Sequence, residues 1–189
     1  MSLQWCEEIK ARYEPDKYCS DSIRLKNYDY SQSGAYYVTI CTQSRRLLFG
    51  NVANGRMQLT RTGIIADECW KEIPKHFPDA MLDAFVVMPN HIHGIVVIRR
   101  DTACRVSTVE RFGKPVANSL PTIIRSYKSA VTKRVNELWQ TQGSSVWQSN
   151  YYEHTIRDEE DLDEIREYII NNPLKWDLDR ENPTNIEAC

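Results

Sequence analysis

Residues 81–98 of the chain read MLDAFVVM-PN-HIHGIVVI, which is two mostly apolar runs separated by Pro89 and Asn90. Each run has the length and the β-branched content of a strand, and a proline followed by an asparagine marks a tight turn. The two runs therefore predict a β-hairpin. Side chains alternate between the two faces of a strand, so His91 and His93 are expected on one face, and the residue between them on the other.

Further elements of both kinds are predicted around this hairpin. Runs of β-branched and aromatic residues favour strands, and apolar residues at helical spacing between capping and stop residues favour helices. Strands followed by helices in this order predict an α+β fold, a single antiparallel sheet covered by helices in the split βαβ or ferredoxin-like arrangement. The predicted strands cover residues 36–42, 51–59 (with the turn signal Asn54-Gly55 inside it) and 147–156. The predicted helices cover the segment from the capping candidate Thr60 to residue 76, 119–140 and 159–172, the last stopped by Pro173.

Length and composition indicate one globular domain. The chain has 189 residues, of which 41% are hydrophobic and 26% charged, a balance that supports one sizeable core. Residues 1–30 are polar and weakly periodic, and we interpret them as an N-terminal arm packed on the domain. The domain itself is expected to span residues 31–178, followed by a C-terminal tail at 179–189.

Simple patterns argue against several classes of protein. The chain has no apolar run of about 18 residues, as a membrane span would need, and its N-terminus lacks the apolar segment of a signal peptide. Its six cysteines include no C-x-x-C pair, which argues against a zinc ribbon or a disulfide framework. We therefore expect a cytoplasmic protein with reduced thiols and no small-molecule cofactor.

The net charge of −2 leaves nucleic acid open as a partner, because binding depends on whether basic residues gather on one face. Acidic residues gather at 158–164, whereas basic residues gather on the helix predicted over residues 119–140. These basic residues either contact DNA phosphates or form a solvated helix face. They are Arg125, Lys128, Lys133 and Arg134.

Two pairs of residues carry the candidate chemistry. Two imidazoles on one face of a rigid strand, His91 and His93, could bind a divalent metal ion, or they could be ordinary polar residues on a solvated sheet face. Tyr168 and Asn172 are four residues apart in the last predicted helix and therefore share one of its faces. Asn172 could offer an amide oxygen to a metal ion, and Tyr168 a phenol. Alternatively, the tyrosine packs in the core and the asparagine belongs to the helix stop.

Together, the two pairs resemble a known family. The His91-Ile92-His93 strand looks like the signature of the HUH endonucleases, and Tyr168 followed by Asn172 resembles their single-tyrosine motif. More closely, the chain is similar to the REP-associated tyrosine transposases, which are relatives of the single-tyrosine insertion-sequence transposases. The matching stretches are YDY at 28–30, GAYYVTICT at 34–42, VMPNHIH at 87–93, WQ at 147–148, YYEH at 151–154, and Tyr168-Ile169 with Asn172-Pro173.

The resemblance implies a site-specific endonuclease and strand transferase that acts on single-stranded, hairpin-forming palindromic DNA. It implies that His91, His93 and Asn172 hold Mg²⁺ or Mn²⁺, and that Tyr168 attacks a phosphodiester to give a 5′-phosphotyrosine link and a free 3′-OH. The insertion-sequence relatives carry glutamine where Asn172 stands, which places the chain with the REP-associated branch. Its members are thought to act as monomers, whereas the insertion-sequence relatives are homodimers.

Three residues are secondary candidates. Glu153 and His154 lie on the strand predicted over residues 147–156, where they could orient a metal ligand, or could instead pack in the sheet or bind DNA. Tyr127 is a rival nucleophile among basic residues, but it has Val131 rather than a polar residue four positions later. Two rival functions stay open, a non-catalytic nucleic-acid-binding module and a metal-dependent nuclease that uses water.

Overall fold

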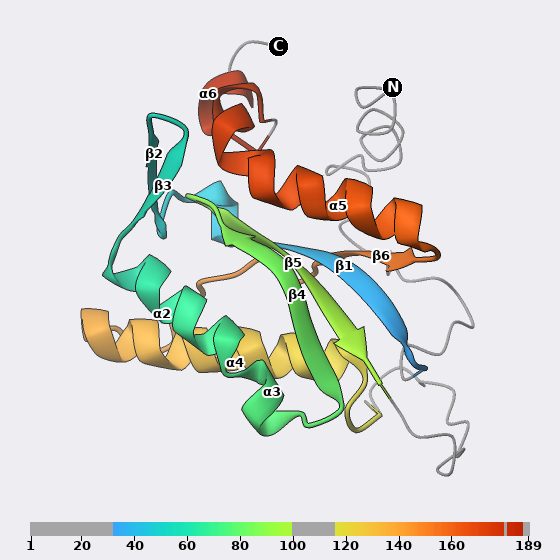
Figure 1. Cartoon of the computed structure of the whole chain (residues 1–189). Coiled ribbons are helices and arrows are strands. Elements are labelled where there is room, and N and C mark those ends of the chain that lie inside the picture. Colours follow the sequence, from blue (N-terminus) through green and yellow to red (C-terminus); the bar gives the residue numbers. More distant parts are fainter. Residues whose placement is uncertain (1–31, 100–115, 180, 187–189) are drawn as a thin grey trace.

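A computed structural model of the chain describes residues 32–99, 116–179 and 181–186. These residues form a four-stranded sheet with helices on both of its faces, and a smaller two-stranded sheet beside it (Figure 1). The strands are β1 (Gly34–Cys41), β2 (Gly50–Ala53), β3 (Arg56–Leu59), β4 (Ala80–Val87), β5 (His91–Ile98) and β6 (Tyr152–Ile156). The helices are α2 (Arg61–Lys71), α3 (Ile73–His76), α4 (Leu120–Trp139), α5 (Glu159–Asn171) and α6 (Pro183–Ile186), together with the 3₁₀ helices η1 (Gln43–Arg45) and η2 (Asn172–Leu178).

The main sheet has the ferredoxin-like topology. Its strands lie in the order β4-β5-β1-β6, and every neighbouring pair is antiparallel. Along the chain, α2 and α3 connect β1 to β4, the β4–β5 hairpin follows, and α4 connects β5 to β6. This is the split βαβ arrangement, with α5 added after the last strand. The predicted fold class is therefore confirmed.

The hairpin of residues 81–98 forms as predicted, and it supplies two strands of the sheet. Its turn is closed by a hydrogen bond from the Met88 amide to the His91 carbonyl (2.8 Å). Neighbouring loops hold the turn from outside, because the amides of Thr42 and Phe49 donate to the carbonyls of Asn90 (2.8 Å) and Pro89 (2.9 Å). The turn before the two histidines is therefore fixed on both sides.

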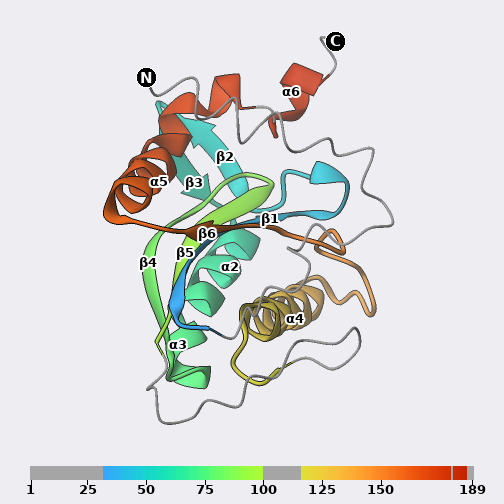
Figure 2. The ribbon, with the colours of Figure 1, turned by 90° about the vertical axis from the view of Figure 1, so that its right-hand side faces the viewer.

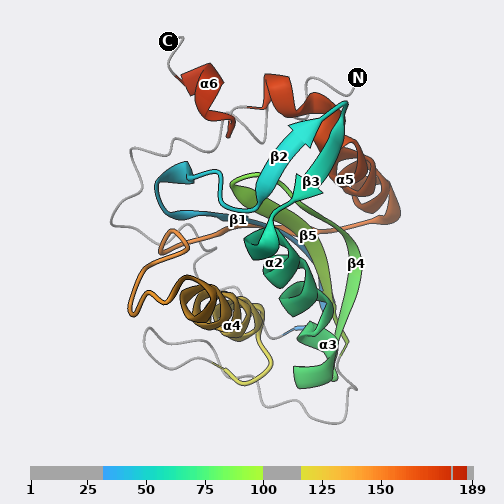
Figure 3. The ribbon, with the colours of Figure 1, turned by 90° about the vertical axis from the view of Figure 1, so that its left-hand side faces the viewer.

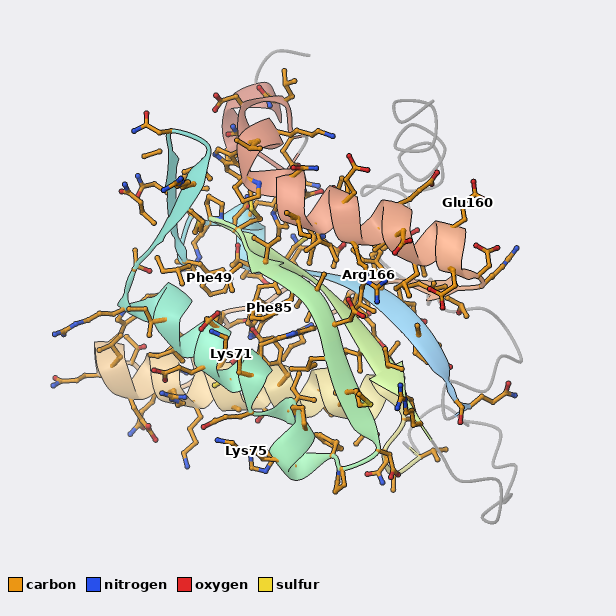
Figure 4. All side chains as sticks on the ribbon, viewed as in Figure 1. Phe49, Lys71, Lys75, Phe85, Glu160 and Arg166 are labelled. Atoms are coloured by element: carbon orange, nitrogen blue, oxygen red, sulfur yellow. The ribbon has the colours of Figure 1, made fainter. Side chains whose placement is uncertain are left out.

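One face of the sheet packs on α2, α3 and α4 and carries the larger core. Trp70 of α2 is fully buried there, and its ring stacks on Phe85, with 5.9 Å between the centroids (Phe85 is labelled in Figure 4). Gly94 of β5 lies directly beneath Trp70, because a Cβ at this position would come within 2.3 Å of the Trp70 ring. The close approach of helix to sheet thus requires a glycine in the histidine strand.

The opposite face of the sheet is covered by α5 (Figure 2), and η2 continues over its His91 end, where the Trp176 ring lies 6.0 Å from the His91 ring, measured between centroids. Tyr37 and Ile95 from the sheet and Ile165 and Ile169 from the helix form its smaller core. Arg166, which points from α5 toward the sheet in Figure 4, donates to both carboxylate oxygens of Asp83 on β4 (2.9 and 2.7 Å). Apolar burial and this bidentate ion pair together fix α5 on the sheet.

The region predicted as one strand over residues 51–59 is a hairpin of two, β2 and β3 (Figure 3). Asn54 and Gly55 form its turn, with φ of 52° and 68°, the left-handed pair that a two-residue hairpin turn requires. Among the described residues, the hairpin pairs only with itself. A Cβ on Gly55 would come within 2.4 Å of a methyl carbon of Leu174 in η2. The predicted turn at Asn54-Gly55 is therefore confirmed, but the prediction of a single strand was wrong, because the turn separates two strands.

The helix predicted over residues 60–76 is two helices. Thr60 caps the first as expected, its hydroxyl accepting from the Gly63 amide (3.2 Å). α2 ends at Lys71, and α3 begins at Ile73. Pro74 lacks the amide hydrogen that a continuous helix would use at this position, and it is tolerated instead in the first turn of α3.

The strand predicted over residues 147–156 is too long at its N-terminal end. Only Tyr152–Ile156 pairs with β1, whereas Trp147 makes an isolated bridge to Thr42. The carbonyls of the residues between them, 148–150, turn toward the Lys128 ammonium. These carbonyls are therefore satisfied by a side chain rather than by a neighbouring strand.

The C-terminal helix ends one residue earlier than predicted, but Pro173 does not end the helical path. α5 ends at Asn171, and the chain continues as η2, with the proline in its first turn. Among the described residues, no helix combines the length and the apolar character needed to cross a membrane. The predicted N-terminal arm, residues 1–30, lies outside the described residues.

Candidate active site

The two histidines of β5 lie side by side on the sheet face that α5 covers. Their ring centroids are 4.4 Å apart, and His91 and His93 are both buried, with 0% and 3% of their surface exposed. The Nε2 atom of each ring is buried and has no hydrogen-bond partner. A buried polar atom without a partner is costly, so two such atoms side by side indicate a site for something they bind.

The Nδ1 atoms of both rings are held by neighbouring residues. His91 Nδ1 lies 2.9 Å from Oδ1 of Asn90, and the Asn90 amide nitrogen donates in turn to two backbone carbonyls. Because Oδ1 can only accept, His91 carries its proton on Nδ1 and leaves the lone pair on Nε2. His93 Nδ1 lies within 2.7 Å of the Tyr37 hydroxyl and 2.9 Å of the Thr39 hydroxyl, either of which can accept its proton. Such supports orient imidazoles for metal binding.

The electrostatics of the site favour neutral imidazoles. Burial lowers the pKa of His91, an effect that the nearby carboxylates of Asp179 and Glu181 oppose. Burial also lowers the pKa of His93 well below its ordinary value. Both rings are therefore neutral near pH 7, the state in which an imidazole can coordinate a metal ion.

One oxygen donor lies beside the histidines, and Asn172, one helical turn after Tyr168, carries a second. The carboxylate of Asp179, just after η2, has an oxygen within 4.8 Å of a ring nitrogen of each histidine. Oδ1 of Asn172, the first residue of η2, is buried and has no hydrogen-bond partner. Imidazole nitrogens together with carboxylate and amide oxygens are ligands of divalent cations such as Mn²⁺ and Mg²⁺. These residues therefore fit a divalent metal ion.

Tyr168 comes to the same place from α5. Its half-buried ring lies 5.3 Å from the His93 ring and 6.3 Å from the Tyr37 ring, measured between centroids. Asn172 keeps helical backbone angles (φ −57°, ψ −43°), so Tyr168 and Asn172 stay one turn apart on a continuous helical face. The structure thus brings Tyr168 against the histidine pair, although the two lie far apart in the sequence.

Comparison with known proteins identifies relatives of the chain. No protein-family model matches the chain. An uncharacterised protein of Haemophilus influenzae is 39% identical over an alignment of 168 residues, which covers 84% of this chain and 91% of that protein. A second protein of the same organism, named "Putative REP-associated tyrosine transposase", is 25% identical over 153 residues, which make up 80% of this chain and 77% of that protein.

The chain belongs to the REP-associated tyrosine transposases. A REP-associated tyrosine transposase solved with a REP hairpin bound has the same fold, with a TM-score of 0.53 and 18% identity over 83% of this chain and 74% of that one. The predicted family is therefore confirmed.

In this REP-associated tyrosine transposase, the rival nucleophile Tyr127 lies on the other side of the sheet. Its side chain is 2% exposed within the larger core, and its hydroxyl donates to the Ala66 carbonyl (3.1 Å). Burial raises the pKa of this phenol well above its ordinary value. Buried and hydrogen-bonded in this way, Tyr127 has a structural role.

The four basic residues of α4 differ in their surroundings. The Lys128 ammonium donates to the carbonyls of residues 148–150 (2.6, 3.2 and 3.2 Å), and burial lowers its pKa to about 8. The Arg134 guanidinium donates to the Glu68 carboxylate. Arg125 and Lys133 are exposed and line a groove of about 550 Å³ between α4 and residues 149–151. α4 and α5 cover opposite faces of the sheet, so this groove lies on the face away from Tyr168 (Figure 2).

The two candidates on β6 lie on opposite faces. Glu153 is directly opposite Val38, a residue of the larger core, so its side chain leaves the sheet on the α4 face, away from the histidine pair. His154 lies on the α5 face, where Nε2 contacts the Asp161 carboxylate (3.0 Å) in the first turn of α5. His154 therefore ties β6 to the start of α5.

Four site residues were not predicted. Tyr37 and Thr39 contact His93, Asn90 contacts His91, and Asp179 faces both rings. Pairing the predicted strand 36–42 with the histidine strand would have placed Tyr37 and Thr39 on the histidine face, since Thr39 lies directly opposite His93. Asp179 carried no such signal, because it falls in the segment predicted as a C-terminal tail.

Proposed function

We propose that this chain is a metal-dependent endonuclease and strand transferase that cuts single-stranded DNA at hairpin-forming palindromes and holds one end on Tyr168. The observation that supports this most directly is the contact of the Tyr168 ring with His93 (5.3 Å between centroids), because His93 and its neighbour His91 each carry a buried Nε2 without a partner. The proposed nucleophile is thus next to a candidate cation site on one face of the sheet.

The reaction follows from the chemistry of a tyrosine phenol. Its oxygen attacks the scissile phosphorus and loses its proton, the bond from phosphorus to the 3′-oxygen breaks, and that oxygen gains a proton to become a free 3′-OH. The 5′ end stays bound to Tyr168 as a phosphodiester, so a second 3′-OH can attack it, rejoin the DNA and restore the phenol. No external energy source is needed, because the number of phosphodiester bonds is unchanged.

A phenol with an ordinary pKa of about 10 is a weak nucleophile at neutral pH and needs help at the phosphate. His91, His93 and Asn172 would hold a divalent cation, which supplies positive charge at the scissile phosphate. The chain's own part is orientation. Asn90 and the hydroxyls of Tyr37 and Thr39 fix the imidazoles, and α5 presents the phenol on its sheet-facing side.

The DNA partner is proposed from two observations. A family member of the same fold has been solved with a REP hairpin bound. This chain also has a groove with two exposed basic side chains, Arg125 and Lys133, together with the polar residues Ser129, Thr132 and Asn150, which can contact phosphates. Because the groove and Tyr168 lie on opposite faces, we propose that the groove holds the DNA backbone while a single strand reaches the tyrosine.

The test is whether a covalent protein–DNA complex forms. The protein is incubated with Mn²⁺ and single-stranded oligonucleotides that carry the palindromes flanking its gene, and the products are separated under denaturing conditions. A retarded protein band that is lost with Tyr168→Phe or a chelator, and kept with Tyr127→Phe, is expected. Free ends without a covalent band would indicate a nuclease that uses water, and binding without cleavage would indicate a DNA-binding module.

A further inference from the structure

We propose that Asp179 is a fourth ligand of the metal site, supplying a carboxylate that the two histidines and Asn172 lack. This inference rests on the proposed metal dependence and deepens it. Asp179 lies outside the H-x-H and Tyr-x₃-Asn motifs, so neither motif points to it. The evidence is the position of its carboxylate, the way that position is held, and the charge it brings.

The position is the first observation. An oxygen of Asp179 and a ring nitrogen of each histidine lie within 4.8 Å of one another, close enough for one ion to contact all three. In the described part of the chain, this is the one cluster of histidine, cysteine, aspartate or glutamate side chains with such spacing. Both histidines are buried there, and Asp179 is half-buried. Because the Nδ1 atoms are held by neighbouring residues, the two Nε2 atoms, which have no hydrogen-bond partner, are the nitrogens available to such an ion.

The turn after η2 holds Asp179 in place and leaves one carboxylate oxygen for a ligand. The Glu181 amide donates to Oδ1 of Asp179 (2.7 Å), while the Asn182 amide and the Asn185 side chain donate to its backbone carbonyl (3.0 and 2.8 Å). These contacts occupy the backbone carbonyl and one side-chain oxygen. Oδ2 accepts no hydrogen bond from these groups and is available to a cation.

The same turn is tied to the support of His91. The Asn90 amide nitrogen donates to the Glu181 carbonyl (2.6 Å), and Arg45 forms an ion pair with the Glu181 carboxylate (2.9 Å). Asn90 also accepts from His91 Nδ1, so one side chain orients the imidazole and anchors the turn that carries Asp179. The histidine and the carboxylate are thereby positioned together, as ligands of one ion need to be.

The Asp179 carboxylate would supply negative charge that the other proposed ligands lack. Two neutral imidazoles and an amide offer a divalent cation no negative charge, and the histidine pair is buried, where an uncompensated ion is costly. One carboxylate offsets half of the charge of the ion. Hard cations such as Mg²⁺ and Mn²⁺ also prefer carboxylate oxygen to nitrogen. Asp179 should therefore contribute strongly to affinity.

The competing explanation is that Asp179 only stabilises its turn. Asp179→Asn separates the two roles, because asparagine keeps an Oδ1 that can accept from the Glu181 amide but loses the charge. The matched control is Asp177→Asn, which removes an exposed carboxylate two residues earlier in the same segment. A third variant, His93→Ala, removes a proposed imidazole ligand.

The experiment is a titration of Mn²⁺ into each metal-free protein, with bound ion followed by electron paramagnetic resonance and the melting temperature recorded with and without Mn²⁺. We expect Asp179→Asn to weaken Mn²⁺ binding by at least about tenfold. Substitution of a residue that only supports a metal ligand already lowers metal affinity by about this factor. Asp179→Asn should also lose most of the Mn²⁺-induced rise in melting temperature, whereas Asp177→Asn should match the wild type.

Two results would overturn the inference, and they are distinguishable. If the wild type and Asp179→Asn bind Mn²⁺ equally while His93→Ala does not, Asp179 is not a ligand, and the metal site of the proposed function stands. If the wild type itself binds no Mn²⁺, both the ligand role and the proposed metal dependence fail. Because the Mn²⁺-induced change is measured within each variant, a lower metal-free stability of Asp179→Asn does not affect the comparison.

Discussion

At the scale of single residues, the site is built from polar atoms that the fold buries without giving them partners. Nε2 of His91, Nε2 of His93 and Oδ1 of Asn172 are of this kind, and all three belong to residues of the two sequence motifs. Burying such atoms costs free energy of folding, so their presence is better explained by binding than by stability. In the turn before the histidines, by contrast, both polar atoms of the Asn90 side chain are hydrogen-bonded.

Tyr127 provides the matched case of a tyrosine whose hydroxyl is already used. We predict that Tyr127→Phe lowers the free energy of unfolding by about 1 kcal/mol, through loss of the hydrogen bond to the Ala66 carbonyl. The yield of covalent DNA complex should be unchanged. Urea denaturation and the denaturing gel measure the two effects. A variant that keeps the wild-type stability but forms no complex would assign the chemistry to Tyr127.

Gly94 shows how a β5 residue that lies beneath a helix constrains the site. A Cβ there would come within 2.3 Å of the Trp70 ring, so Gly94→Ala should push α2 from the histidine strand and cost about 1–3 kcal/mol of unfolding free energy. Gly34→Ala, in the neighbouring strand, meets nothing closer than 3.5 Å and is the control. Equal midpoints of chemical denaturation for the two variants would mean that the helix does not lie as close as described.

At the scale of elements, the geometry of the proposed active site depends on how α5 lies on the sheet. The smaller core under α5 involves few side chains, and the bidentate pair between Arg166 and Asp83 joins the helix to β4. Tyr168 follows Arg166 by two residues. Glu160 lies on the exposed side of the same helix, away from the sheet (Figure 4). The ion pair therefore limits how far the phenol can move relative to the histidines.

Removal of this pair should affect both activity and pH dependence. The hydrogen bonds from Arg166 hold the pKa of the Asp83 carboxyl below its ordinary value of 3.8. A carboxyl with a depressed pKa stabilises the fold above its unfolded pKa, and this contribution is lost as the pH falls through the folded pKa. We therefore predict that Asp83→Asn is less stable than the wild type at pH 6, and that the difference shrinks below pH 3.8.

The same variant should form covalent complex more slowly, by up to about 100-fold if the phenol is displaced by an ångström. The control is Asp163→Asn, which removes the other, largely exposed partner of Arg166 (72% exposed) and should change both properties less. Stability is measured by urea denaturation across the pH range. A difference between Asp83→Asn and the wild type that stays constant down to pH 3 would contradict the depressed pKa.

At the scale of the whole molecule, the two faces of the sheet carry different parts of the proposed function. The α5 face carries Tyr168 and the candidate metal ligands, and the α4 face carries the larger core and the groove with Arg125 and Lys133. A net charge of −2 is compatible with DNA binding in this arrangement, because the exposed acidic residues gather on α5 and these two basic ones on α4.

We predict that Arg125→Ala and Lys133→Ala each weaken binding of hairpin DNA and each reduce the slope of log affinity against log salt by about one, as the loss of one phosphate contact should. Mn²⁺ binding should be unaffected, because the groove and the histidines lie on opposite faces. Lys75→Ala, an exposed lysine on α3 that does not line the groove (labelled in Figure 4), is the control. Identical salt slopes for all three variants would contradict a role for the groove in DNA binding.

Much of the fold was predictable because it is encoded locally. The histidine hairpin, Thr60 as a helix cap and the long helix after Ser119 each depend on patterns within a few residues. Features that depend on tertiary contacts were not predicted. The strand expected over residues 147–156 is shortened because Lys128, from a different element, takes the carbonyls of residues 148–150.

The site divides in the same way. The H-x-H strand and the Tyr168–Asn172 pair are visible because strand and helix periodicity each put two residues on one face. Their meeting, and the approach of Asp179 to the histidines, depend on the packing of α5 and η2, which no local pattern describes. The family resemblance predicted that the two motifs meet, but it did not predict that Asp179 approaches the histidines.

The central claim is that Tyr168 carries the DNA, and locating the attached nucleotide by mass spectrometry tests it most directly. The covalent complex is trimmed with nuclease and digested with trypsin, which should release Glu167–Lys175 with Tyr168 as its one tyrosine, and Ser126–Lys128 with Tyr127. We predict a nucleotide monophosphate on Glu167–Lys175, absent when Mn²⁺ is withheld. A nucleotide on Ser126–Lys128, or on the peptide that contains Tyr37, would contradict the account.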